Sequence, residues 1–359
     1  MKINDLPPEL VQKIHRGVVI PAHPLALNKK RLLDEKHQKA LTRYYIDSGA
    51  GGIAVGVHTT QFEIRDPRVG LFKPVLALAS QTADEYLAKS KLPAIFKIAG
   101  VCGKTPQAVK EAEFALEAGY HAVLLSLAAF KKNDVRKILA HCREIASIIP
   151  VVGFYLQPVV GGRILPYEFW RKFAEIANVI AIKIAPFNRY QTLDVVKAVC
   201  HTGREKDISL YTGNDDNIVI DLLTQYKIPT PAGEKSIRIV GGLLGHWAFW
   251  TKCAVELLNE IHGLVDSEQP VSPQMFTLAA QVTDANAAVF NAVNNFAGCI
   301  AGVHEVLRRQ GLMTGTWCIN PKETLSQNHK KQIDEIYAVY PHFNDDDFVK
   351  QNLHKWLSD

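Results

Sequence analysis

Eight short apolar runs, separated by amphipathic segments, are the feature that most restricts the fold of this 359-residue chain. Each run has the length and the β-branched composition of a buried strand. The runs occupy residues 17–22, 51–57, 93–100, 121–127, 150–156, 179–185, 208–213 and 236–242. Strands that alternate with helices at these spacings predict an α/β fold, the (β/α)8 TIM barrel. A doubly wound sheet is the competing prediction, but no GxGxxG sequence follows the first run to support it.

The segments between the runs carry helical signals. Residues 105–119 begin with Thr-Pro, an N-cap followed by a proline at the first helical position, and they end at a glycine. After about residue 265 the strand signals stop and the sequence is almost wholly helical. We therefore predict a barrel domain over residues 1–264 and a C-terminal helical domain over residues 265–359.

The charge pattern argues against a nucleic-acid partner. The net charge of +5 comes from 41 basic and 36 acidic residues that are spread along the chain. The densest basic clusters, NKKRLL and FKKNDVRK, are short and read as solvated helix faces. The N-terminal segment has no signal-peptide core, and no apolar run reaches the ~18 residues of a membrane span. We therefore expect a cytoplasmic protein without a membrane partner.

The cysteines and acidic residues do not have the spacing of a metal site. None of the six cysteines belongs to a CxxC pair, and most lie in apolar contexts, as reduced buried thiols do. The acidic pairs and triplets at residues 215–216 and 345–347 are not spaced with histidines as metal ligands would be. We predict no metal and no cofactor.

A single lysine interrupts the sixth run, whose other residues are typical of a strand buried on both faces. Ala181, Lys183 and Ala185 share one face of such a strand, and three isoleucines share the other. Burial penalises an ammonium group, so we hypothesise that Lys183 has a lowered pKa and is a nucleophilic amine that forms a Schiff base with a ketone. The alternative is that Lys183 lies at the strand end and extends into water.

The fifth run repeats this pattern. Val151, Gly153, Tyr155 and Gln157 share one face, and we expect the small Gly153 to leave room on the barrel side. If the fifth and sixth strands are neighbours, Tyr155 and Lys183 meet near the C-terminal strand ends, where barrel enzymes place their active sites. A tyrosine there is able to transfer protons to and from the amine and a leaving group.

Polar residues or glycines follow three other runs. Thr59 and Thr60 follow the second run, where their hydroxyl and N–H groups are able to hold a carboxylate; an ordinary Ser/Thr turn is the alternative. Gly213 ends the seventh run and permits close approach of a ligand, and the acidic residues after it also fit a helix N-cap. VGGLLG ends the eighth run without the lysine of a phosphate loop.

Two histidines and a tryptophan are expected near the same end of the barrel. They are His58, His246 and Trp247, which follow the second and the eighth run. A histidine in such a place more often packs or contacts substrate than catalyses, so we predict that His58 and His246 help to bind the second substrate.

Taken in chain order, these residues resemble the dihydrodipicolinate synthase / N-acetylneuraminate lyase family. Members are Schiff-base aldolases and dehydratases on a barrel with a C-terminal helical domain. The resemblance covers roughly residues 16–310. It consists of Thr-Thr after the second strand, Tyr-x-x-Pro after the fifth, Lys in the sixth and Gly-x-Asp after the seventh. IPAHPLAL and AGVCGKTPQAVKEAEFALEAG are also similar to the family's first strand end and to its loop and helix after the third strand.

The resemblance implies a role for five residues. Lys183 is identified with the residue that forms the imine, Tyr155 with the acid/base, and Thr59 with a hydroxyl that links to Tyr155 in a proton relay. Thr60 resembles the residue that holds the carboxylate of a 2-oxo acid, and Gly213 resembles a backbone position that lines the substrate. A homodimer or homotetramer with active sites near one interface is also implied.

The sequence departs from the family pattern at several positions. His-Thr-Thr-Gln-Phe at residues 58–62 replaces the family's Gly-Thr-Thr-Gly-Glu. Residues 128–130, Ala-Ala-Phe, stand about where the family has tyrosines after the fourth strand, and Leu156 stands where many members have asparagine. Arg163 is an offset candidate for the arginine that helps to bind the second substrate in the synthases. These departures argue against a true dihydrodipicolinate synthase.

We therefore predict a class I lyase that acts on pyruvate or another 2-oxo acid, in aldol cleavage or condensation or in dehydration. The first alternative is a non-catalytic 2-oxo-acid binding protein on the same barrel, because the tyrosines after the fourth strand are lost. The second is an unrelated barrel enzyme with a metal or phosphate site, since one barrel fold hosts many chemistries.

Overall fold

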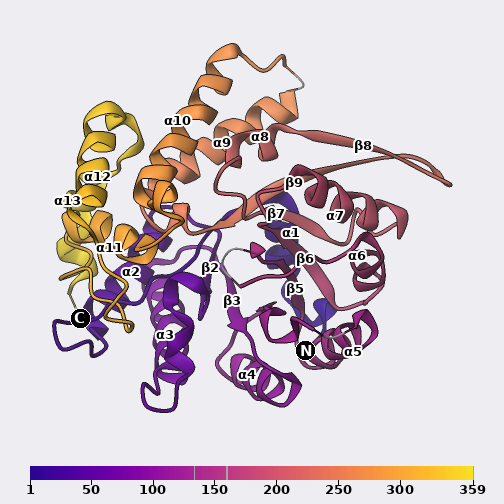
Figure 1. Ribbon diagram of the computed structural model, residues 1–359, viewed down its shortest axis with the longest axis horizontal. Coiled ribbons are helices and arrows are strands. Elements are labelled where there is room, and N and C mark those ends of the chain that lie inside the picture. The colour runs from indigo at the N-terminus through magenta and orange to yellow at the C-terminus, as the bar shows by residue number, and fades with distance from the viewer. Residues whose placement is uncertain (133, 159–160, 268, 359) are drawn as a thin grey trace. The chain divides into compact units, whose positions relative to one another are not determined.

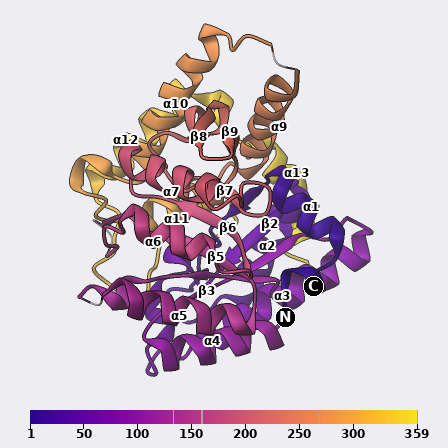
Figure 2. The same cartoon turned by 90° about the vertical axis from the view of Figure 1, so that its right-hand side faces the viewer.

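The computed structural model describes residues 1–132, 134–158, 161–267 and 269–358. The fold is a nearly closed barrel of eight parallel strands with helices between them, followed by a C-terminal helical region (Figures 1 and 2). This confirms the predicted fold. The chain folds into two compact units, unit 1 (residues 1–18 and 96–243) and unit 2 (residues 19–95 and 244–359). The predicted domain boundary at residues 264/265 falls inside a helix, α9 (Thr251–Ser267), and the predicted division stays a prediction.

Unit 1 contains six parallel strands that pair in chain order. They are β3 (Phe96–Val101), β4 (Ala122–Leu125), β5 (Val151–Tyr155), β6 (Val179–Ile184), β7 (Ser209–Thr212) and β9 (Gly233–Leu244). The helices of unit 1 are α1 (Pro8–Arg16), α4 (Thr105–Glu117), α5 (Val135–Ile148), α6 (Tyr167–Ala174), α7 (Arg189–His201) and α8 (Ile218–Leu223). Every residue of β3 to β7 is buried, as is usual for parallel strands covered on both faces.

The two faces of this sheet have different neighbours. On the outer face, a Cβ at Gly153 would lie 2.6 Å from the ring of Phe173 in α6, so glycine permits the close packing of this helix on β5. On the inner face, the hydroxyl of Tyr211 in β7 donates to the carbonyl of Ile14 in α1, 2.8 Å away. His15 of α1 also contacts Ser209, the first residue of β7. Helix α1 therefore packs beside the N-terminal end of β7.

Two details of unit 1 differ from the sequence predictions. An additional strand, β8 (Gln225–Thr230), pairs antiparallel with β9, and the two form a hairpin that extends beyond α7 in Figure 1. The segment QYKIPTP contains two prolines, which made a strand hard to predict because proline cannot donate a hydrogen bond to a neighbouring strand. Thr105 is the first residue of α4 rather than its N-cap, and its hydroxyl oxygen lies 2.9 Å from Nδ1 of His141.

Unit 2 contains two strands, β1 (Val19–Pro21) and β2 (Gly52–Val55), joined by a parallel bridge between Ala22 and Ala54. Its helices are α2 (Glu35–Asp47), α3 (Phe72–Ser90), α9 (Thr251–Ser267), α10 (Pro273–Val289), α11 (Cys299–Arg309), α12 (Gln327–Val339) and α13 (Asp346–Trp356). After β9, the described part of the chain contains helices and turns but no strand, as the sequence predicts.

A buried carboxylate connects several helices of unit 2. Asp345, which precedes α13, accepts hydrogen bonds from the hydroxyl of Tyr44 in α2 (2.7 Å) and the N–H of Lys252 in α9 (3.0 Å). It also accepts one from the amide of Gln310, just after α11 (2.7 Å). A buried carboxylate is tolerated only where its oxygens have such partners, so Asp345 fixes the arrangement of these helices.

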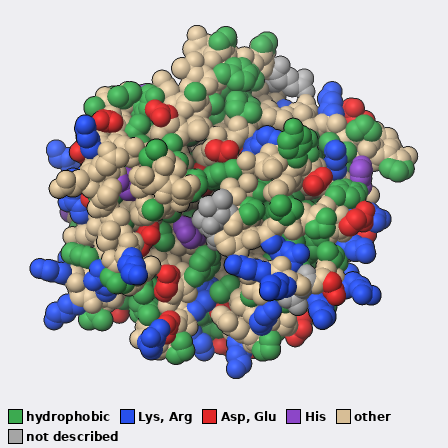
Figure 3. Space-filling view, in the orientation of Figure 1, with side chains coloured by type: hydrophobic (Ala, Val, Ile, Leu, Met, Phe, Trp, Pro, Cys, Tyr) green, Lys and Arg blue, Asp and Glu red, His purple; other side chains and the backbone are tan. Residues whose placement is uncertain are grey.

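The charged side chains on the surface are spread out, as they are along the sequence. Figure 3 shows basic and acidic side chains intermixed on the face in view. No helix in the described ranges is long and apolar enough to cross a membrane. Within the same ranges, no group of three or more His, Cys, Asp or Glu side chains is arranged to hold a metal ion. All six cysteines are free thiols.

We predict that Asp345→Ala lowers the free energy of unfolding by about 2–4 kcal/mol, because it leaves buried donors of three helices without an acceptor. Urea denaturation followed by circular dichroism measures the change. Asp347→Ala is the matched control, since Asp347 is exposed in the first turn of α13 and should cost less than about 1 kcal/mol. Equal losses for the two variants would contradict the assigned role of Asp345.

Candidate active site

Lys183 lies in β6, one residue before the C-terminal end of the strand. Its side chain is on the inner face, where Nζ stands 4.7 Å from the ring centroid of Phe154 in β5. Strand pairing places Lys183 between Phe154 and Tyr211 of β7. Only 9% of Lys183 is exposed, so the alternative in which this lysine extends into water is wrong.

Burial shifts the titration of Lys183. Desolvation lowers the pKa of this amine from 10.5 to about 8, against a smaller raising effect of the Asp215 carboxylate. At neutral pH roughly one-tenth of such a lysine is the neutral amine, compared with less than a thousandth of an ordinary lysine. The neutral amine is the form that attacks a carbonyl carbon.

Gly213, which follows β7, makes room for the lysine. A Cβ at this position would lie 2.5 Å from Cε of Lys183 and 2.7 Å from Cβ of Ala185, closer than real side chains approach. The N–H of Gly213 donates to the carbonyl of Ile184, 2.7 Å away, so this turn is bonded to the end of β6. The sequence marked Gly213 as a position of close approach, and in the structure the group that approaches is Lys183. A contact between Gly213 and a substrate stays a prediction.

The prediction that Tyr155 and Lys183 share one face is wrong. The pairing of β5 with β6 shifts by one residue between Val151 and Val152, so that Phe154 lies opposite Lys183 and Tyr155 lies opposite Ile184. The ring of Tyr155 therefore packs on Trp170 of α6, with centroids 5.0 Å apart, on the outer face.

The hydroxyl of Tyr155 is also engaged elsewhere. It donates to the carbonyl of Leu165 and accepts from the N–H of the same residue, both at 3.2 Å, and burial raises the pKa of this tyrosine. The role of Tyr155 in a proton relay with Thr59 stays a prediction. The side chain that faces Nζ from β5 is an apolar ring without a proton to give.

A hydrogen-bond network holds the loop that follows Gly213. Asp221 of α8, 1% exposed, accepts from the hydroxyl of Thr212 (2.7 Å) and from the amides of Asn214 and Asn217 (both 2.8 Å). Arg189 of α7 forms an ion pair with the same carboxylate. These bonds anchor the loop, and Asp215 lies between two residues whose side chains are bound to Asp221.

Sequence reasoning missed Phe154 and Asp221 as members of this region, and it gave no role to Asp215, the aspartate of the Gly-x-Asp sequence. The signal for Asp215 was the sequence NDDN, which follows β7 and Gly213. A helix N-cap explained that sequence equally well. We call Lys183, Phe154, Gly213 and Asp215 together the lysine site.

The two threonines after β2 have structural bonds of their own within unit 2. The hydroxyl of Thr59 donates to the carbonyl of Ala22 (2.6 Å). The hydroxyl of Thr60 donates to the carbonyl of His23 (2.7 Å) and accepts from the N–H of Gly56 (2.9 Å), while the N–H of Thr60 donates to Val57. These residues tie the loop after β2 to the end of β1. Their predicted roles in proton transfer and carboxylate binding stay predictions.

The two candidate histidines of unit 2 have different surroundings. His58 is half-buried beside Phe62, with ring centroids 6.1 Å apart. His246 is 9% exposed, and burial lowers its pKa to about 4, so that it is neutral at physiological pH. His246 and Trp247 line a pocket of about 220 Å³ together with side chains of α9 and α10. Substrate contacts of either histidine stay predictions.

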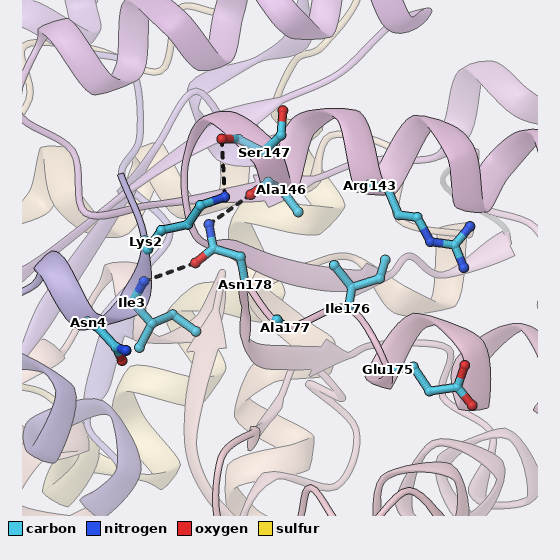
Figure 4. A pocket seen from close by; sticks show the side chains of 10 residues that line it. All are labelled: Lys2, Ile3, Asn4, Arg143, Ala146, Ser147, Glu175, Ile176, Ala177 and Asn178. Carbon is cyan, nitrogen blue, oxygen red and sulfur yellow. Dashed lines mark hydrogen bonds between the residues drawn. The ribbon is translucent and has the colours of Figure 1, made fainter.

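Arg163 and a pocket beside Asn178 are two features of unit 1 outside the lysine site. Arg163, the offset candidate for a second-substrate ligand, donates to the carbonyl of Phe130 (2.6 Å), so it connects the loops after β4 and β5. A pocket of about 560 Å³ lies at the opposite end of β6 from Lys183 (Figure 4). There Asn178 accepts from the N–H of Ile3 and donates to the carbonyl of Ala146, which fastens the N-terminal segment.

A model of the dihydrodipicolinate synthetase family matches residues 16–225, more than half of the chain. The chain belongs to this family. The resemblance that its residues predicted is therefore confirmed.

The curated relatives of this family member are distant. It is 34% identical to 4-hydroxy-tetrahydrodipicolinate synthase of Clostridium novyi (strain NT) over 117 residues, 32% of this chain and 38% of that protein. It is 25% identical to the enzyme of the same name from Thermoanaerobacter sp. (strain X514) over 142 residues, 39% of this chain and 46% of that protein. These matches span less than half the length of either relative.

Solved structures share the fold over most of the chain. Dihydrodipicolinate synthase from Acinetobacter baumannii, complexed with pyruvate, has a TM-score of 0.71 at 17% identity and covers 90% of this chain and 98% of its own. N-acetylneuraminate lyase from Fusobacterium nucleatum, also complexed with pyruvate, has a TM-score of 0.68 at 16% identity, covering 90% and 97%. At these identities the likeness concerns the fold alone.

We predict that Lys183 becomes reactive with a midpoint near pH 8, since its pKa is lowered to about 8. Below that pH the ammonium form dominates and does not react; above it the amine form dominates and the rate levels off. Short pulses of formaldehyde and cyanoborohydride, followed by peptide mass analysis, measure methylation of each lysine. Ordinary exposed lysines, with pKa values near ~10.4, serve as internal controls. A midpoint for Lys183 that coincides with theirs would contradict the assignment.

Proposed function

We propose that this protein is a Schiff-base lyase that condenses Lys183 with the keto group of pyruvate or another 2-oxo acid. The observation that carries the proposal is the desolvated amine of Lys183, with a pKa of about 8, near the C-terminal end of a barrel strand. Barrel enzymes place their reacting groups at this end of the sheet. Membership of the dihydrodipicolinate synthetase family supports the same chemistry.

The imine is useful because it withdraws electrons from the neighbouring carbons. The neutral amine attacks C2 of the 2-oxo acid, water leaves, and the protonated imine then accepts the electron pair released when a bond to the adjacent carbon breaks. That bond is carbon–carbon in an aldolase and carbon–hydrogen in a dehydratase, where the resulting enamine then expels a hydroxyl group from the next carbon as water. Residues 128–130 carry no hydroxyl in the segment after β4, which supports an acceptor different from that of the true synthases.

One observation favours the second candidate, a protein that binds a 2-oxo acid without turning it over. Phe154 occupies the position beside Nζ at which a proton-transferring side chain was expected. An apolar ring there is compatible with binding and removes one means of catalysis. A homodimer or homotetramer stays a prediction under either candidate.

Borohydride reduction in the presence of pyruvate tests the proposal. We expect the intact mass of the parent protein to rise by one pyruvate, less one water and plus two hydrogens, with the modified peptide containing Lys183. Lys183→Met, which keeps the length and apolar stem of the side chain without the amine, should form no adduct. Circular dichroism checks that this variant is folded.

Two further results separate the candidates. Exchange of the methyl hydrogens of pyruvate with deuterated water, observed by proton NMR, requires the imine and its enamine and is expected for the lyase. Saturable binding of pyruvate with neither adduct nor exchange, unchanged in Lys183→Met, would replace the lyase with the binding protein.

A further inference from the structure

The backbone of Gly213 lies against the side chain of Lys183. A Cβ at Gly213 would stand 2.5 Å from Cε and 3.1 Å from Cγ of the lysine, so this part of the main chain runs along its aliphatic stem. Lys183 is 9% exposed, and burial is the largest cause of its lowered pKa. The low hydration of the amine therefore depends on the position of the Gly213 backbone.

One carboxylate oxygen binds both residues that flank this glycine. Oδ2 of Asp221 in α8 accepts from the hydroxyl of Thr212 (2.7 Å) and from the side-chain amide of Asn214 (2.8 Å). The hydroxyl of Thr212 also accepts from the N–H of Asn214, 3.1 Å away. All three polar side chains are buried, where the loss of a hydrogen-bond partner is costly. Residues 212–214 are thus held as one turn around a single oxygen atom.

The same turn is bonded to the end of the lysine's own strand. The N–H of Gly213 donates to the carbonyl of Ile184, 2.7 Å away. The amide of Asn214 donates to Asp221 through Nδ2 and accepts from the N–H of Phe187 through Oδ1 (3.2 Å). Because Asp221 fixes the orientation of this amide, it also secures the bond to Phe187.

The other oxygen of Asp221 has partners away from the glycine. Oδ1 accepts from the side-chain amide of Asn217 (2.8 Å) and forms the ion pair with Arg189 of α7. Neither residue flanks Gly213, and both are more exposed than the partners of Oδ2. The two oxygens therefore separate the bonds that hold Gly213 from those that do not.

We propose that Asp221 is a positioning residue for Lys183: through Thr212 and Asn214 it holds the Gly213 backbone against the lysine and keeps water away from the amine. In this role Asp221 acts through the loop rather than by contact with the amine. The inference rests on the proposed Schiff-base function for its purpose, because a poorly hydrated amine is more often in the neutral form that attacks a keto group.

The titratable side chains beside Lys183 stay in place in the test of this role. Tyr211 pairs with Lys183 from β7, and its hydroxyl is bound to the carbonyl of Ile14, with its pKa raised by burial. The charge of Asp215, in the loop after β7, raises the pKa of the lysine. Phe154 in β5 does not titrate. With these residues retained, a change in the pKa of Lys183 reports on the position of the loop and on the water that it excludes.

The test is the pH midpoint of Lys183 methylation in Asp221→Ala and in Thr212→Val. We expect the midpoint to rise from about 8 by about one pH unit or more, towards the ~10.4 of a hydrated lysine. At pH 7 the borohydride-trapped pyruvate adduct should then form about tenfold more slowly, since the share of neutral amine falls by that factor. Loss of the Asp221 charge alone predicts the opposite sign, because removing a carboxylate lowers the pKa of a nearby lysine. Thr212→Val changes no charge.

Two further variants make the result specific. Asn217→Ala is the matched control, because it removes an amide from the same carboxylate at the oxygen that does not hold the turn. Its midpoint should stay within about 0.3 pH unit of the parent value. Asp221→Asn keeps one oxygen, which is able to face Thr212 and Asn214 while the more exposed Asn217 and Arg189 turn to water. Its midpoint should therefore stay closer to the parent value than that of Asp221→Ala.

The outcomes separate this inference from the function on which it rests. A midpoint that is unchanged or lower in Thr212→Val overturns the role of Asp221, even where circular dichroism shows that Asp221→Ala is unfolded. Equal shifts in Asn217→Ala and in Thr212→Val overturn it as well. Methylation needs no pyruvate. A parent protein that forms no pyruvate adduct, while Thr212→Val still raises the midpoint, overturns the Schiff-base function and leaves the positioning role of Asp221 standing.

Discussion

The desolvation of one amine is the constraint on which the lysine site depends. A lysine in the middle of a parallel sheet loses most of the hydration of its charged form, and the structure compensates only in part. The ring of Phe154 offers its face to the ammonium, a contact that is worth more when water is excluded. Asp215 adds an opposite charge. Because neither restores full hydration, the pKa of Lys183 settles at about 8, where the charged and neutral forms are both accessible near neutral pH.

The sequence was sufficient to predict the fold and the lysine, because both depend on local patterns. All eight parallel strands were predicted from short apolar runs, and the alternation within β6 correctly separated Lys183 from the isoleucines. The alternation within β5 correctly placed Gly153 and Tyr155 on one face, but that face packs on α6, so the prediction that Gly153 leaves room on the barrel side was wrong. What the sequence did not contain was the pairing of these two strands.

That pairing decides which residue meets the lysine. If the register set by Val151 and Val179 had continued, Tyr155 would lie opposite Lys183. The shift by one residue between Val151 and Val152 places Phe154 there instead. A one-residue change of register exchanges the two faces of a strand, and a bulge of this kind has no reliable signature in a single sequence. Long-range partners such as Asp345 and Tyr44, 301 positions apart, were equally inaccessible to local patterns.

The bulge in β5 turns the hydroxyl of Tyr155 away from Lys183. The loop after β7 therefore decides the surroundings of the amine more than β5 does. That loop is held in place by several side-chain hydrogen bonds and an ion pair. Asp221 is buried, and it is tolerated because Arg189, Thr212, Asn214 and Asn217 all bind it. Such a network fixes Gly213 and its neighbours before any substrate arrives, and fixed geometry is what makes a charged group effective in a dry site. The same fixation explains the glycine: a backbone held this close to β6 leaves no room for a Cβ beside Lys183. The lysine's reactivity is therefore a property of two strands and one anchored loop, and a substitution at Asp221 acts on the amine by moving that loop.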